Sequence, residues 1–127
     1  MLYSIFLICC GASVGALIRW QLGIQLNPLF VNIPLGTLIA NLVGCYLIGL
    51  SVGAFSSFQS VPQEVRLLGV VGFLGGLTTF SGFSAEVVVL IQREQLSWAL
   101  GLVSLHVIGS LIMTFLGIFT IQFLRGV

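Results

Sequence analysis

Residues 72–86 read GFLGGLTTFSGFSAE, and most of them lie in a 19-residue stretch, residues 67–85, without a charged side chain. A helix that spans a membrane needs about 20 mostly apolar residues, so this stretch is long enough to cross a bilayer. Adjacent glycines followed by threonines and serines are poor formers of a continuous helix. We therefore predict a membrane-spanning helix that is broken at mid-membrane, around residues 76–79.

The rest of the chain is equally apolar. Of its 127 residues, 58% are hydrophobic and only 6% are charged, with a mean hydropathy of +1.23 and a formal net charge of +1. Because a soluble domain carries about a quarter charged residues, this composition indicates an integral membrane protein in contact with the lipid bilayer. The small net charge excludes nucleic-acid binding driven by phosphate neutralisation, so no nucleic acid is expected as a partner.

Three further charge-free stretches, residues 1–18, 20–63 and 95–124, determine how often the chain crosses the membrane. The second of them, with 44 residues, is long enough for two helices and a turn, which Pro28 and Pro34 mark. We predict an all-α integral membrane protein made of one domain, residues 1–127, with four transmembrane helices. The predicted helices cover about residues 2–24, 34–55, 66–90 and 96–124, with a polar turn at residues 56–65. The cysteines, which show no metal-ligand spacing, are interpreted as small residues that face lipid or the core: Cys9, Cys10 and Cys45.

The arginines are balanced between the two sides of the membrane. Arg66 and Arg125 lie on the side of the termini, Arg93 and Arg19 lie toward the other side, and the chain has no lysine. Orientation normally follows the Lys and Arg bias of short loops, which is zero here. The balance predicts copies inserted both ways that pair as an antiparallel, dual-topology homodimer. The alternative is that factors outside the sequence set a single orientation.

Glycine pairs four residues apart recur on three helices, as at Gly11 and Gly15. Small residues at this spacing let helix backbones approach closely in lipid. The repetition predicts tight helix packing.

Polar residues inside the spans mark candidate functional positions, because such groups tend to face a bundle interior or an aqueous path. Asn41 lies near the start of the second span, and His106, Ser110 and Thr114 follow one another at intervals of four on the fourth. Residues at this spacing lie on one helical face. The stripe predicts either a lined pathway or ordinary hydrogen bonding, including hydroxyls bonded to carbonyls four residues earlier.

A break in the third span would free backbone carbonyl oxygens, which need partners in hydrocarbon. In an antiparallel dimer, two such breaks would meet and form an oxygen cage for a monovalent cation. The alternative is a kink repaired by the hydroxyls of Thr78 and Ser81. Beside the break, Phe80 and Phe83 are spaced to share one face, and the electropositive edge of a phenyl ring suits a small dehydrated anion.

Two charged residues near the ends of the predicted spans, Arg19 and Glu86, each have two alternative roles. Arg19 either reaches the interface or draws anions into a vestibule, and Glu86 either caps its helix or pairs with an arginine. The sequence contains no combination of nucleophile, base and orienting group, so we predict that the protein is not an enzyme.

The chain resembles the Fluc (CrcB-type) fluoride channels over nearly its whole length. The resemblance rests on residues 11–20 (GASVGALIRW), Gly36-Thr37 with Asn41, residues 75–86 (GGLTTFSGFSAE), and Gly109-Ser110 with Thr114. The family usually has a threonine where this chain has Gly82.

The resemblance implies an antiparallel dual-topology dimer with two pores that export cytoplasmic fluoride passively across the bacterial inner membrane and so lower its toxicity. It also implies a structural, non-transported Na⁺ held by the backbone carbonyls of Gly75 and Thr78 from both subunits. The implied fluoride pathway comprises Asn41, Phe80, Ser81, Phe83, Ser84, Ser110 and Thr114.

Two other functions are compatible with four spans. A proton-coupled exporter of the small multidrug-resistance type needs an embedded carboxylate, for which Glu86 is the candidate. A haem-anchoring subunit would need His106 as an axial ligand.

Overall fold

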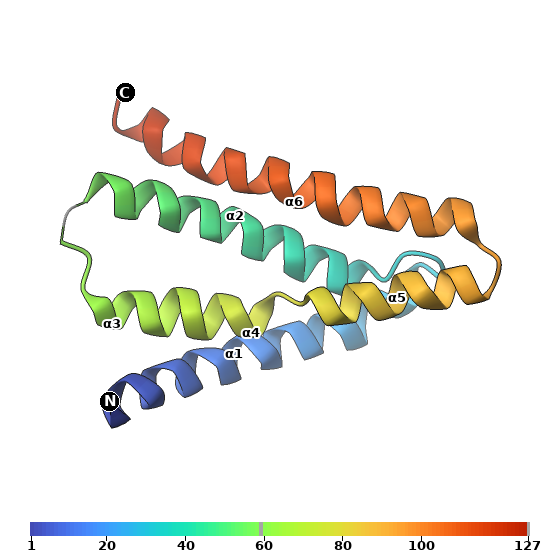
Figure 1. The fold of residues 1–127 in the computed structure, drawn as a ribbon, viewed down its shortest axis with the longest axis horizontal. Coiled ribbons are helices and arrows are strands. Elements are labelled where there is room, and N and C mark those ends of the chain that lie inside the picture. The colour runs from blue at the N-terminus through green and yellow to red at the C-terminus, as the bar shows by residue number, and fades with distance from the viewer. Residues whose placement is uncertain (59, 127) are drawn as a thin grey trace.

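The structure is a computed structural model that describes residues 1–58 and 60–126, and all its regular elements in these ranges are helical. Four of its helical segments are long and apolar enough to cross a membrane: Leu2–Leu29, Leu35–Ser57, Gln63–Gln92 and Leu96–Leu124. The predicted all-α architecture with four potential spans is therefore confirmed. The four rods lie side by side, with both termini at the same end (Figure 1).

The helical elements begin and end close to the expected positions. The polar turn predicted for residues 56–65 is shorter, because helix continues through Ser57 and starts again at Gln63. The elements are α1 (Leu2–Leu26), the 3₁₀-helix η1 (Asn27–Leu29), α2 (Leu35–Ser57), α3 (Gln63–Val65), the π-helix η2 (Arg66–Leu74), α4 (Gly75–Leu77), α5 (Phe80–Gln92) and α6 (Leu96–Leu124).

Between α4 and α5 the backbone leaves the helical conformation for two residues. Thr78 has φ −88° and ψ 153°, and Thr79 has φ −149° and ψ 123°, both extended. Helix resumes at Phe80, where the Thr79 hydroxyl accepts the N–H of Gly82 at 3.0 Å. Threonine is a favoured N-cap because its side-chain oxygen satisfies an amide that has no partner in the first turn.

The helices pack through close backbone contact at small residues. A Cβ at Gly15 of α1 would lie 2.1 Å from the carbonyl oxygen of Phe73 in η2. A Cβ at Gly49 of α2 would lie 2.2 Å from the carbonyl oxygen of Thr114 in α6. Neither position has room for a methyl group, so the glycines set the spacing of both helix pairs.

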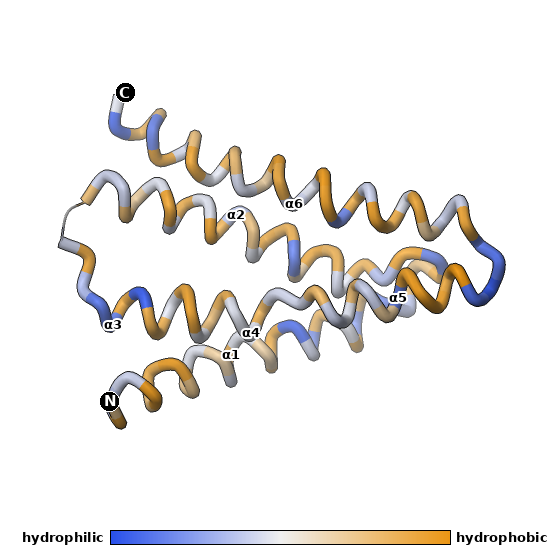
Figure 2. Tube along the Cα trace, viewed as in Figure 1, coloured by the Kyte–Doolittle hydropathy of each residue, from blue (hydrophilic) through white to orange (hydrophobic). Residues whose placement is uncertain are grey.

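A side chain between α1 and α2 accepts hydrogen bonds from backbone N–H groups in the first turn of α2. The Asn27 side-chain oxygen accepts the N–H groups of Gly36 at 2.8 Å and of Thr37 at 3.3 Å. Hydrophilic residues gather at the ends of the helices, whereas hydrophobic residues predominate between them (Figure 2). Large side chains such as Phe115, which is 72% exposed, present an apolar surface that suits lipid or a second protein.

Candidate functional site

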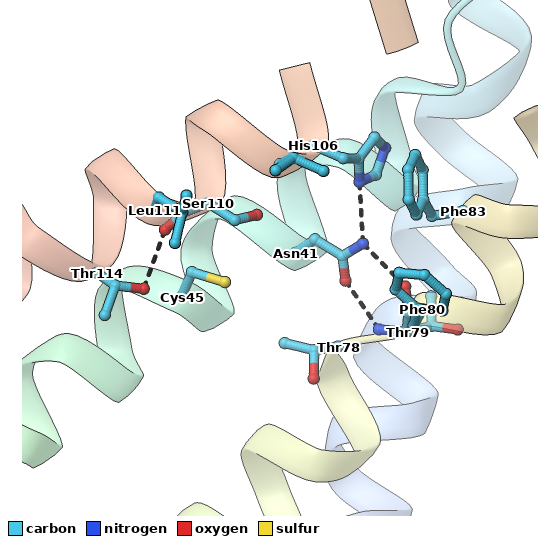
Figure 3. Close-up of a pocket in the computed structure, with 11 residues that line it drawn as sticks. Asn41, Cys45, Thr78, Thr79, Phe80, Phe83, His106, Ser110, Leu111 and Thr114 are labelled. Atoms are coloured by element: carbon cyan, nitrogen blue, oxygen red, sulfur yellow. Dashed lines mark hydrogen bonds between the residues drawn. The ribbon is translucent and has the colours of Figure 1, made fainter. Parts of the chain in front are cut away.

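An open hollow of about 420 Å³ lies where α2, α6 and the interruption between α4 and α5 meet. It contains five of the residues predicted for the pathway, together with His106 of the polar stripe on α6 (Figure 3). None of the described residues that line it is an arginine, lysine, aspartate or glutamate. The lining residues are Asn41, Cys45, Thr78, Thr79, Phe80, Phe83, His106, Val107, Ser110, Leu111 and Thr114.

Asn41 holds the extended backbone of Thr79 with both ends of its side-chain amide. The Asn41 Oδ1 accepts the Thr79 N–H at 2.8 Å, and the Asn41 Nδ2 donates to the Thr79 carbonyl at 3.0 Å. The Nδ2 also lies 3.1 Å from the Nδ1 of His106 (Figure 3). Because a reversed amide would place donor against donor at Thr79, these contacts determine the orientation of Asn41.

His106 is enclosed in this arrangement, with 4% of its surface exposed. Its ring stacks on Phe83, with centroids 4.3 Å apart and an interplanar angle of 25°. Since the Asn41 Nδ2 only donates, the His106 Nδ1 is the acceptor and Nε2 carries the ring proton. Among the described residues, this buried Nε2 has no hydrogen-bond partner. An unsatisfied buried donor costs about 1–3 kcal/mol.

The two phenylalanines form an edge-to-face pair at the hollow. Their centroids are 5.6 Å apart and their planes meet at 75°. Phe83 is 6% exposed, whereas Phe80 is 77% exposed. Phe83 is therefore a fixed wall of the hollow, and Phe80 lies at its open side.

The polar stripe on α6 lines the hollow along its length, with His106, Ser110 and Thr114 on the same side. The Thr114 hydroxyl donates to the carbonyl of Ser110 at 2.9 Å. For Thr114, the alternative of hydrogen bonding within its own helix is thus observed, although its side chain still borders the hollow. The structure brings together Asn41, both phenylalanines and this stripe.

Two predicted pathway residues lie outside this lining. The Ser81 hydroxyl is 3.2 Å from the Thr79 hydroxyl and is exposed, and Ser84 is half-buried on α5. Both lie on α5 (Phe80–Gln92), and among the described residues of this helix only Phe80 and Phe83 line the hollow.

The charged residues predicted near the site contact the protein backbone or a hydroxyl. The Arg19 Nε donates to the carbonyl of Gly76 at 3.0 Å, so this arginine binds the end of α4. The Glu86 Oε1 accepts from the Thr37 hydroxyl at 2.5 Å, so the partner of this carboxylate is a hydroxyl and not an arginine. Both alternatives raised for Glu86, a helix cap and an arginine pair, are replaced by this bridge between α5 and α2.

The interruption leaves two carbonyl groups without their usual helical donors. The Thr79 N–H, which would bond the Gly75 carbonyl in a continuous helix, donates to Asn41. The Gly82 N–H, which would bond the Thr78 carbonyl, donates to the Thr79 hydroxyl. The Thr78 hydroxyl donates to the Leu74 carbonyl at 2.9 Å, as the repaired-kink alternative expects, but this bond serves neither of the two carbonyls.

Comparison with known proteins places these features in a family. The family profile described as "CrcB-like protein, Camphor Resistance (CrcB)" matches residues 6–118. The chain belongs to this CrcB family. It is 56% identical to a protein of Tolumonas auensis over 98% of both chains, and 56% identical to one of Pseudomonas putida over 99% of both. It is 53% identical to a protein of Pseudomonas aeruginosa over 97% of both chains. All three relatives are named fluoride-specific ion channel FluC.

In this CrcB protein, Cys45 belongs to the site, although the sequence alone predicts only a small residue that faces lipid or the core. It lies one turn after Asn41 on α2 and lines the hollow, and it is half-buried (Figure 3). Its spacing of four from Asn41 was the available signal, because residues at i and i+4 share a helical face.

Proposed function

We propose that the protein is a fluoride-specific ion channel, not an enzyme, and that it exports cytoplasmic fluoride passively. The observation that carries this proposal is the hollow in which two phenyl rings, the amide of Asn41 and the stripe of polar groups on α6 meet. The names of relatives that match nearly the whole chain support the same function.

The chemistry of the hollow suits a small anion that must pass through and leave. Ring edges of Phe80 and Phe83 carry partial positive charge, and the Ser110 hydroxyl can donate a hydrogen bond to an anion. The Thr114 hydroxyl already donates to the Ser110 carbonyl, so an anion would have to displace that carbonyl to bind it. No arginine or lysine is among the described residues of the lining. Conduction requires binding that is weak enough for release, which a full positive charge would oppose.

The driving force for export is the membrane potential. A negative-inside potential of about 100 mV contributes about 2.3 kcal/mol per elementary charge, which favours outward movement of an anion. The proposal therefore places the protein in the bacterial inner membrane, as a multi-pass protein that needs no other energy source. In this role it would lower the toxicity of fluoride.

We further propose that two copies pair antiparallel, with dual topology. The hollow opens at the surface of the single chain, and Phe80 at its open side is 77% exposed, which leaves a conduction path without one wall. A second copy would supply that wall. The even distribution of arginines, two toward each side, supports insertion in both orientations.

The carbonyls of Gly75 and Thr78 fit a structural Na⁺, because their helical donors are engaged elsewhere and carbonyl oxygen suits a hard cation. Such an ion would supply positive charge for carbonyls contributed by both copies. We also propose that the interruption between α4 and α5 lies at mid-membrane.

Fluoride efflux from liposomes that contain the purified protein tests the function. A fluoride electrode should record rapid efflux that is independent of any proton gradient. Proton-coupled exchange of a cationic drug, abolished by Glu86→Gln, would instead favour the exporter and contradict the proposal.

A further inference from the structure

Asn41 has no free donor for an anion in this structure. A side-chain amide carries two N–H bonds. One is donated to the Thr79 carbonyl at 3.0 Å and the other to the His106 Nδ1 at 3.1 Å. Any anion that accepts a hydrogen bond from Asn41 must therefore displace one of these two acceptors.

The two acceptors differ in how firmly they are held. Thr79 is bound twice by Asn41, and it also caps α5 through Gly82, so its displacement would disturb the backbone of the interruption. His106 is bound to Asn41 by one hydrogen bond and to Phe83 by stacking. Its Nε2 is buried without a partner among the described residues, so its present position leaves one donor unsatisfied. His106 is the easier of the two to displace.

We infer that His106 is an internal competitor for the anion: its Nδ1 occupies the Asn41 donor that fluoride takes during conduction, and fluoride and His106 bind this donor in turn. The inference rests on the proposed function and assigns to His106 control of the affinity at that site. While no anion is present, His106 keeps the donor satisfied, and it takes the donor back when the anion leaves.

The arrangement has a physical advantage for a channel. A buried donor with no partner would bind fluoride tightly and release it slowly, because the departing anion would leave the donor unsatisfied. A neutral acceptor that replaces the anion stabilises the empty site, so the free-energy difference between the occupied and the empty site becomes smaller. Two ionisable groups lie on the elements packed around the hollow: Cys45 on α2, which lines it with His106, and Glu86 on α5, one turn beyond Phe83 and bonded to Thr37.

The first test measures fluoride current across planar bilayers as a function of fluoride concentration. In His106→Phe, an aromatic ring can still stack on Phe83 but accepts no hydrogen bond from Asn41. We expect the half-saturating fluoride concentration to fall about fivefold, the equivalent of one neutral hydrogen bond, and the maximal current to fall as release slows. His106→Gln, whose side-chain oxygen accepts a hydrogen bond, should restore wild-type half-saturation. Ser104→Ala, on the exposed side of α6, is the matched control and should change neither quantity.

The second test uses the fact that His106 is the only histidine in the chain. In protein labelled with ¹⁵N-histidine, one Nδ1 signal reports the bond to Asn41. Saturating fluoride should move this signal toward that of an unprotonated nitrogen without a hydrogen bond, and the same concentration of chloride should leave it in place.

An unchanged or higher half-saturating concentration in folded His106→Phe would overturn the inference, as would an Nδ1 signal that fluoride does not move. The proposed function would survive either result, because the wild-type protein would still conduct fluoride. Absence of fluoride current from the wild-type protein would overturn the function and the inference together.

Discussion

Asn41 and Thr79 form a two-point pair in which a side chain replaces the hydrogen bonds of a helix. The Asn41 Oδ1 accepts the Thr79 N–H at 2.8 Å, and the Asn41 Nδ2 donates to the Thr79 carbonyl at 3.0 Å. The pair lies at the wall of the hollow, so one residue of α2 both stabilises the extended backbone and borders the proposed pathway. Structure and conduction are therefore coupled at Asn41.

Replacement of Asn41 by aspartate should block conduction. The carboxylate still accepts the Thr79 N–H but donates to neither Thr79 nor His106, and it adds a negative charge where an anion must pass. Like charges about 4 Å apart repel by about 4 kcal/mol at an intermediate dielectric constant, so fluoride efflux should fall more than about a hundredfold. Efflux from liposomes measures this, with Asn32→Asp in the turn as the control. A fully active Asn41→Asp protein would exclude Asn41 from the pathway.

Replacement of Phe80 or Phe83 by isoleucine should reduce fluoride efflux about tenfold, because an aliphatic group lacks the electropositive ring edge. Size-exclusion chromatography should show that each variant keeps the oligomeric state of the parent protein. Phe6→Ile, at an exposed position on α1, should leave efflux unchanged. Normal efflux in both variants would remove the role assigned to the rings.

Replacement of Gly76 by alanine should destabilise the protein by roughly 1–3 kcal/mol, because the added Cβ would lie 2.4 Å from the carbonyl oxygen of Ala12. Gly69→Ala is the matched control, since a Cβ there would meet nothing within 4 Å. Thermal unfolding in detergent measures the difference between the two variants. Equal stability of the two would contradict the close approach of α1 to α4.

Replacement of bath Na⁺ by a large organic cation should silence fluoride efflux slowly, since the carbonyls of Gly75 and Thr78 would lose the proposed ion. Return of Na⁺ should restore efflux, and circular dichroism should show that the helices persist throughout. Efflux that is indifferent to Na⁺ removal would dispose of the proposed sodium site.

The number of potential membrane spans could be predicted from the sequence, because the charge-free apolar stretches and the turn marked by Pro28 and Pro34 determine it. The 3₁₀-helix η1 and the π-helix η2 were not predicted. The spacing of His106, Ser110 and Thr114 also predicted a shared face, since helical periodicity depends only on sequence separation. The family resemblance carried by residues 75–86 predicted Phe80 and Phe83 as pathway residues, and both line the hollow.

The partners of the polar groups could not be predicted in this way, because they depend on how separate helices are placed. Nothing local indicates that Arg19 binds the Gly76 carbonyl, 57 residues away, or that Glu86 binds Thr37. Placement of Ser81 and Ser84 outside the lining likewise follows from the rotation of α5 about its axis. That rotation is set by tertiary packing and not by residue type.

The most direct test of the central claim compares fluoride and chloride efflux from liposomes that contain only this protein. If the protein is a fluoride-specific channel, fluoride efflux should be rapid and chloride efflux should not exceed that of protein-free liposomes. Equal rates for the two halides, or fluoride efflux no faster than that of protein-free liposomes, would contradict this function.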